Sequence, residues 1–184
     1  MSEQAAPPGP AQTAPGPGGQ ASGGGGRAPA LLVSACLVGV ACTHRAEART
    51  HPAVVALGES AVLIPVCPEV AGGLPTPRPA AERTADGRVR TADGRDLTDF
   101  YGRGAAHAVA VARAAGVTRA VLKARSPSCG SRQVYDGTHS GVLVAGEGVA
   151  AAALRAAGVA VVSEEELDDW GVGLPGEAAR GASL

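Results

Sequence analysis

Cysteines are the residues of this chain whose type and position best suit chemistry. There are only four among 184 residues. Cys36 ends the apolar run "ALLVSAC", Cys67 ends "AVLIPVC", and Cys129 lies in a turn, "SPSCG", just after "TRAVLKA". A single free cysteine is most often a buried apolar side chain. Three cysteines at equivalent ends of apolar runs are better explained by one shared site.

The apolar runs and the segments between them indicate how that site is built. Short apolar runs bounded by turn-forming residues predict buried strands, and we expect four of them, at 30–36, 61–67, 118–124 and 159–167. Helices are expected at 52–57, from Asp96 or Thr98 to Gly116, and at 146–158. Strands that alternate with helices form parallel βαβ units. The predicted fold is therefore α/β: a single domain with a mostly parallel, Rossmann-like sheet flanked by helices.

The segment 68–95 resembles a long loop. It contains Gly-Gly, Pro-Thr-Pro and two Asp-Gly pairs, which are turn signals. The Asp-Gly pairs flank "RVRTA" and predict a small surface hairpin. Loops of this length in a compact domain are usually functional or disordered.

Parallel topology predicts that the three cysteines meet. In an open parallel sheet the ligand crevice lies outside the carboxyl ends of the strands, where Cys36, Cys67 and Cys129 are expected. Three thiolates could hold zinc with a fourth ligand or an open position. They could also hold an iron–sulfur cube, whose four corners normally take four cysteines, and leave one iron open as a Lewis acid. Spacing does not choose between these, and Cys42 is either a further ligand or a loop thiol.

Composition excludes other classes of function. The formal net charge is -1 and aromatic residues make up 2% of the chain, so there is neither the basic patch nor the stacking platform of a nucleic-acid-binding protein. No segment is long and apolar enough to span a bilayer, and the first residues do not form a signal peptide. We therefore expect a cytoplasmic protein without a membrane partner. Residues 1–29 are predicted to be a disordered tail and 167–184 a loose C-terminal tail, around a domain at 30–166.

Several sequence blocks together resemble the DUF523 family, whose characterised members include thiouracil desulfidases. The blocks are "LVSACLVGVACTHR", "VCPEVAGGLPTPRPAAE", "GRDLTDFYGRGA", "LKARSPSCGS" and "GVAAAALRAAGVAVVSEEE", and the resemblance runs from about residue 31 to about residue 166. It implies a [4Fe-4S] cluster on Cys36, Cys67 and Cys129. It also implies that Glu69 and Ser126 are catalytic. The expected partners are a thiolated small-molecule substrate and the iron–sulfur assembly machinery.

The chain departs from the family at two places. Cys42-Thr43-His44-Arg45-Ala46 stands where the family commonly has Cys-Arg-Tyr-Asp-Gly, and His139 stands where an aromatic residue is more usual. The resemblance implies that the first loop lies near the active site. The identity of the substrate therefore stays open, although thiouracil-like heterocycles are the leading class.

The implied reaction is a non-redox desulfuration. A thiocarbonyl sulfur is soft and suits an open iron, which makes the carbon electrophilic, so that water attacks it and sulfide is released. Glu69 is the expected base for the water and the acid for the ring nitrogen. Ser126 would donate to a substrate carbonyl or position the water. On sequence alone, Glu69 would be read as a surface carboxylate or helix cap and Ser126 as a turn hydroxyl.

Two other functions remain compatible with the cysteine pattern. One is a protein that binds zinc or delivers a cluster, and the other is a metal-free sulfurtransferase with one cysteine as nucleophile. Among the weaker candidates, Arg78 and Glu82 either close over the site or pair with each other, and His44 is expected to be a surface histidine.

Overall fold

Four parallel strands form the central sheet of the protein, in the order β2-β1-β5-β8. The computed structural model describes residues 28–167. Its strands are β1 Ala30–Ser34, β2 Val62–Val66, β3 Ala81–Arg83, β4 Val89–Thr91, β5 Arg119–Leu122, β6 Gln133–Tyr135, β7 Leu143–Ala145 and β8 Ala160–Ser163. Its α-helices are α1 Pro52–Ala56, α2 Pro68–Ala71, α3 Thr98–Ala114 and α4 Val149–Ala156, with 3₁₀ helices at Ala35–Val38, Leu57–Glu59 and Glu164–Glu166.

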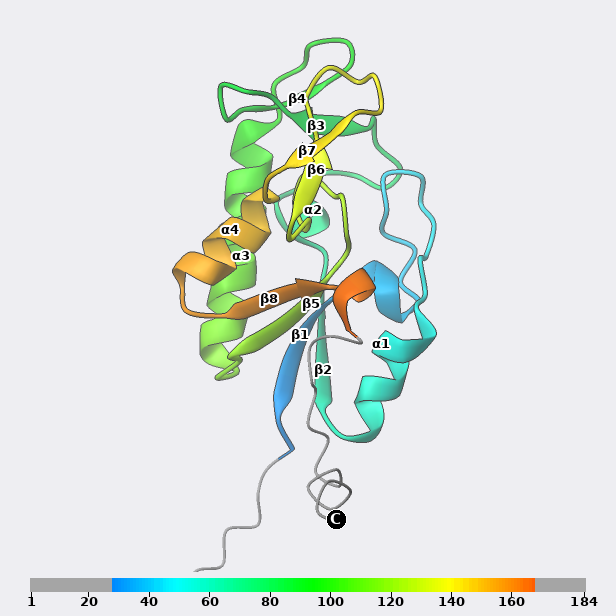
Figure 1. The fold of residues 1–184 in the computed structure, drawn as a ribbon, viewed down its shortest axis with the longest axis vertical. Coiled ribbons are helices and arrows are strands. Elements are labelled where there is room, and N and C mark those ends of the chain that lie inside the picture. Colours follow the sequence, from blue (N-terminus) through cyan, green and yellow to red (C-terminus); the bar gives the residue numbers. More distant parts are fainter. Residues whose placement is uncertain (1–27, 168–184) are drawn as a thin grey trace, which may run out of the picture.

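Helices cover both faces of this sheet. Side chains alternate between the two faces along a strand. Leu32 and Ala120 pack with α3 and α4 on one face, whereas Leu31, Val33 and Val121 pack with α1 on the other. Figure 1 shows α3 and α4 on one side of the strands and α1 on the opposite side. The predicted α/β domain with a parallel sheet flanked by helices is confirmed.

The four predicted sheet strands are all present, but they end earlier than expected. β1 stops at Ser34, and Cys36 lies in the 3₁₀ helix that follows. β2 stops at Val66, so Cys67 is the first residue after the strand. Pro65 is tolerated because β2 is an edge strand that pairs only with β1. Each cysteine thus lies beyond a strand end rather than within the strand.

The segment 68–95 is more ordered than a loop. It begins with α2, a single turn that the sequence analysis missed. Cys67 has an extended backbone before this turn, and Pro68 takes the first helical position, where its missing N–H has no cost. The predicted hairpin is confirmed as β3–β4, which turns at Asp86 and Gly87.

A second hairpin, β6–β7, was not predicted. Its two strands are antiparallel and have three residues each. Figure 1 shows both hairpins beyond the carboxyl ends of β1 and β2, at the top of the molecule. The hairpins therefore lie at the same end of the sheet as the cysteines.

The predicted tails, 1–29 and 167–184, fall outside the described residues except for positions 28, 29 and 167. Within residues 28–167, no helix combines the length and the apolar character needed to cross a bilayer.

Candidate active site

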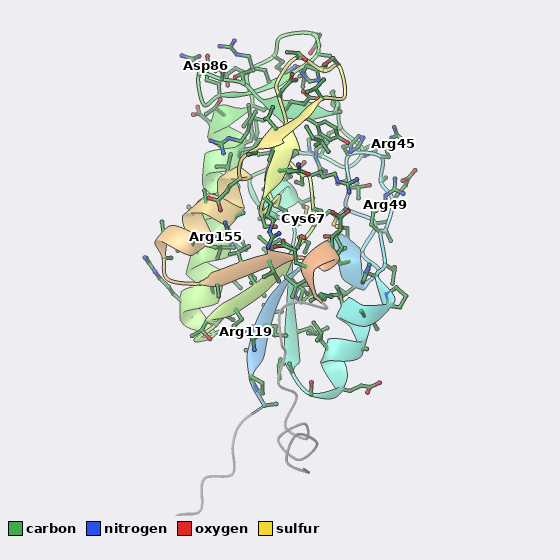
Figure 2. All side chains as sticks on the ribbon, viewed as in Figure 1. Arg45, Arg49, Cys67, Asp86, Arg119 and Arg155 are labelled. Atoms are coloured by element: carbon green, nitrogen blue, oxygen red, sulfur yellow. The ribbon has the colours of Figure 1, made fainter. Side chains whose placement is uncertain are left out.

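A cavity of about 560 Å³ lies at the carboxyl ends of the sheet strands, and all four cysteines line it. Both hairpin regions contribute to its wall, through Ala81, Glu82 and Tyr135. Figure 2 shows Cys67 in the middle of the molecule, where the sheet meets the hairpins. The structure therefore brings Cys36, Cys67 and Cys129 to one cavity, as the topology predicted, and adds Cys42.

The four thiols are free and largely buried. Cys42 hydrogen-bonds to Cys36 and to Cys67, and its bond with Cys36, together with burial, raises the pKa of Cys42 to about 11. The bond to Cys42 and burial also raise the pKa of Cys67. Burial raises the pKa of Cys129 to about 12. These three thiols keep their protons at neutral pH, and a metal that binds a thiol must displace its proton.

The turn that carries Cys129 is held from two sides. The hydroxyl oxygen of Ser126 accepts hydrogen bonds from the backbone N–H groups of Ser128 and Cys129, each at 3.1 Å. The first N–H groups of α4 donate to this turn: Val149 to the carbonyl of Pro127 and Ala150 to that of Ser128, both at 2.9 Å. The position of the Cys129 thiol is thereby fixed.

α4 can approach this turn only because a glycine precedes it. A Cβ atom on Gly148 would lie 2.3 Å from the carbonyl carbon of Ser128, well inside van der Waals contact. Glycine at this position is what lets the helix end reach the turn.

The two predicted catalytic residues lie next to each other. Glu69 is on α2, and its Oε1 is 3.5 Å from the Ser126 hydroxyl, which donates to it. Because two N–H groups already occupy the Ser126 oxygen as acceptor, the hydroxyl hydrogen is free to point toward the carboxylate. Burial and the nearby Glu69 carboxylate raise the pKa of Tyr101, so that its phenol stays protonated beside Glu69.

Arg78 and Glu82 do not pair with each other, contrary to one of the two expectations. Arg78 forms an ion pair with Glu69 at 2.7 Å. Glu82 instead accepts the backbone N–H groups of Gly137 and His139, at 3.0 and 2.9 Å. Both residues line the cavity, so the expectation that they close over the site fits the structure.

His44 is not a surface histidine, which corrects the sequence analysis. It lines the cavity and is half-buried. Burial and the charge of Arg45 lower the pKa of His44, so its imidazole is neutral at pH 7. The signal available in the sequence was its place two residues after Cys42, in the loop that departs from the family pattern.

Each cationic side chain that lines the cavity is paired with a carboxylate. Arg49, Arg78, Lys123 and Arg125 pair with Glu47, Glu69, Glu164 and Glu165 in that order. Figure 2 places Arg49, with Arg45, on the loop that flanks this region.

The donor chemistry of the cavity fits an iron–sulfur cluster. Iron–sulfur clusters are held by cysteine thiolates, and here thiols from three strand ends surround a space larger than one metal ion requires. Within residues 28–167, no three His, Cys, Asp or Glu side chains are grouped closely enough to hold a single metal ion.

The protein is thus a parallel-sheet α/β domain in which thiols, a carboxylate and a hydroxyl line one cavity at the ends of the strands. The model of the 2-thiouracil desulfurase family matches residues 31–166. The chain belongs to this family.

Two relatives extend the comparison. "Uncharacterized protein YbbK" of Bacillus subtilis (strain 168) is 38% identical over 148 residues, which cover 76% of this chain and 98% of that protein. A solved structure described as the [4Fe-4S]-dependent thiouracil desulfidase TudS superposes with a TM-score of 0.74 and 42% identity, over 80% of this chain and 98% of that chain.

Proposed function

We propose that this protein is a [4Fe-4S]-dependent desulfidase that converts 2-thiouracil and water into uracil and hydrogen sulfide. The observation that carries the proposal is a single cavity lined by four thiols together with Glu69 and Ser126. Membership of the 2-thiouracil desulfurase family and 42% identity to the thiouracil desulfidase TudS support it.

Cys36, Cys67 and Cys129 are the proposed cluster ligands, because each follows a different strand of one parallel sheet. When bound through three thiolates, the cluster supplies an iron without a protein ligand, which acts as a Lewis acid toward the soft thiocarbonyl sulfur. Cys42 lies beside Cys36 and Cys67 as a fourth thiol that is not needed for this arrangement.

Glu69 and Ser126 carry out the proton transfers in this proposal. Oε1 of Glu69 accepts a proton from the attacking water and passes it by way of the ring nitrogen to the departing sulfur. The Ser126 hydroxyl, 3.5 Å from that oxygen, orients the water or the substrate carbonyl. The carbon–oxygen bond forms and the carbon–sulfur bond then breaks. The second proton of the water also leaves with the sulfur, so the products are uracil and hydrogen sulfide and no electrons are transferred.

The free thiols also indicate the cellular compartment in which we expect the enzyme to work. All four cysteines are free, and free thiols persist in a reducing compartment such as the cytoplasm. We therefore expect the iron–sulfur assembly machinery of the same compartment to load the cluster.

Turnover of 2-thiouracil by anaerobically purified protein tests the proposal. Uracil and sulfide should appear in equal amounts. Glu69→Gln should retain its iron and lose turnover by about 10²- to 10⁴-fold, the range for loss of a general base. Glu59→Gln is the matched control, because Glu59 is exposed and outside the cavity. Iron-loaded wild-type protein that releases no sulfide, or undiminished turnover in Glu69→Gln, would refute it.

A further inference from the structure

The Arg78 guanidinium makes four hydrogen bonds, which involve all three of its nitrogens. Nε and Nη2 both reach Oε2 of Glu69, at 2.8 and 2.7 Å. Nη2 also donates to the carbonyl of Cys42 at 3.1 Å. Nη1 donates to the carbonyl of Pro75 and the hydroxyl of Thr76, each at 3.2 Å. The N–H donors of a guanidinium lie in one rigid plane, so hydrogen bonds from all three nitrogens define the orientation of this side chain.

The ion pair is removed from solvent. The side chain of Arg78 is 3% exposed and that of Glu69 is 13% exposed. A buried charge is costly unless it is paired and hydrogen-bonded. Each member of the pair therefore holds the other in its place on the cavity wall.

The two carboxylate oxygens of Glu69 consequently have different surroundings. Oε2 accepts the Nε–H of Arg78 and lies 2.7 Å from its Nη2, whereas Oε1 faces the Ser126 hydroxyl. We propose that Arg78 is a positioning residue for the desulfuration: it occupies Oε2 and so leaves Oε1 as the single oxygen that exchanges protons with water and substrate. This inference rests on the proposed function of the site.

The same guanidinium links the carboxylate to the cysteine region. The carbonyl of Cys42, which Arg78 binds, also accepts a hydrogen bond from the Cys67 sulfur at 3.7 Å. Arg78 thus sets the position of Glu69 relative to a proposed ligand. Lysine could supply the charge but not this planar array of donors.

Arg78→Met and Arg78→Lys test the inference by steady-state kinetics with 2-thiouracil. Misplacing a catalytic group by about 1 Å costs about 100-fold in rate. We expect kcat of Arg78→Met to fall by about that factor, with little change in KM and with wild-type iron content. Arg78→Lys should recover only part of the loss. Loss of iron in both variants would show a purely structural role and overturn the inference.

Arg155→Met is the matched control. Arg155 also joins a carboxylate, Glu147, to two backbone carbonyls, those of Ser131 and Val161, but it does not line the cavity. This variant should lower the thermal midpoint and leave kcat unchanged. If Arg155→Met reduced kcat as much as Arg78→Met does, the effect of Arg78 would reflect stability alone.

A double-mutant cycle separates positioning from a general disturbance. If Arg78 acts through Glu69, Arg78→Met should reduce kcat no further in a Glu69→Gln background. A full additional loss in that background would contradict the inference. If the wild-type protein released no sulfide, the proposed function itself would be refuted. Failure of the proposed function can therefore be told apart from failure of the inference about Arg78.

Discussion

Ser126 shows how one side chain can serve both structure and chemistry. Its oxygen accepts the N–H groups of Ser128 and Cys129, which shapes the turn around a proposed ligand. Its hydrogen is directed at Oε1 of Glu69. The two interpretations of Ser126 from the sequence, a turn hydroxyl and a catalytic donor, are therefore compatible with each other.

Replacing this hydroxyl should affect both stability and turnover. Ser126→Ala leaves two partly buried N–H groups without their acceptor, which costs about 1–3 kcal/mol for a buried unpaired group, and it also removes the donor to Glu69. Urea unfolding of the iron-free protein and kcat with 2-thiouracil measure the two effects. Ser126→Thr keeps the hydroxyl and should restore the stability. If Ser126→Ala had the same unfolding free energy and the same kcat as wild type, both the structural and the catalytic role of Ser126 would be contradicted.

At the scale of elements, α2 is held against α3 by two glycines. A Cβ atom on Gly104 would lie 1.9 Å from the carbonyl oxygen of Pro68, and one on Gly72 would lie 2.0 Å from that of Phe100. The backbones of α2 and α3 are in direct contact here, so no flexible side chain could move to make room for an added Cβ atom. Because α2 carries Glu69 and follows Cys67, the close contact fixes both relative to the cavity.

Gly104→Ala should therefore force α2 and α3 apart. Overpacking of this kind costs about 1–3 kcal/mol, and displacement of Glu69 should also lower kcat. Gly102→Ala is the control in the same helix: its Cβ would meet nothing within 4 Å, and Ala is favoured over Gly in a helix by up to about 1 kcal/mol. Urea unfolding and turnover of both variants provide the comparison. A Gly104→Ala protein as stable as Gly102→Ala would contradict the packing described here.

The start of α3 should make stability depend on pH in acid. Asp96 accepts the backbone N–H and the hydroxyl of Thr98 and pairs with Arg88. These contacts, those with Thr98 first, lower the pKa of Asp96 to about 2. A carboxylate with a depressed pKa stabilises the fold above its unfolded pKa of about 3.9, and this stabilisation is lost as the pH falls through the folded value.

Asp96→Asn should thus have a lower thermal midpoint than wild type at pH 6. The difference should shrink below about pH 4 and be mostly lost near pH 2, where the carboxyl of the folded wild type is about half protonated. Thermal melts of both proteins between pH 2 and pH 7 measure it. A difference that stays constant over this range would show that the charge of Asp96 has no part in the effect.

At the scale of the whole molecule, the parallel sheet could be predicted from the sequence because each of its strands is a short, mostly apolar run. Strands buried on both faces need such runs, and parallel pairing directs their ends to one edge. Cys36, Cys67 and Cys129 could be assigned to one site from that argument alone. That all four cysteines line the cavity agrees with it.

Other features depend on tertiary contacts that leave no local pattern. α2 has four residues and β6 and β7 have three each, which is too short for either periodicity to appear. The partner of Arg78 was also not predictable. Glu82 is nearer in sequence, but its carboxylate binds the loop at Gly137 and His139, whereas α2 brings Glu69 to the guanidinium.

The central claim is that thiols from three strand ends hold one iron–sulfur cluster at this cavity. The most direct test is the iron and acid-labile sulfide content of anaerobically purified wild-type protein and of the four single Cys→Ser variants. The wild type should contain about four iron and four sulfide per chain. Cys36→Ser, Cys67→Ser and Cys129→Ser should lose most of both, whereas Cys42→Ser should retain them. A wild-type protein that carries zinc or no metal, or a Cys42→Ser variant as depleted as the other three, would contradict the account.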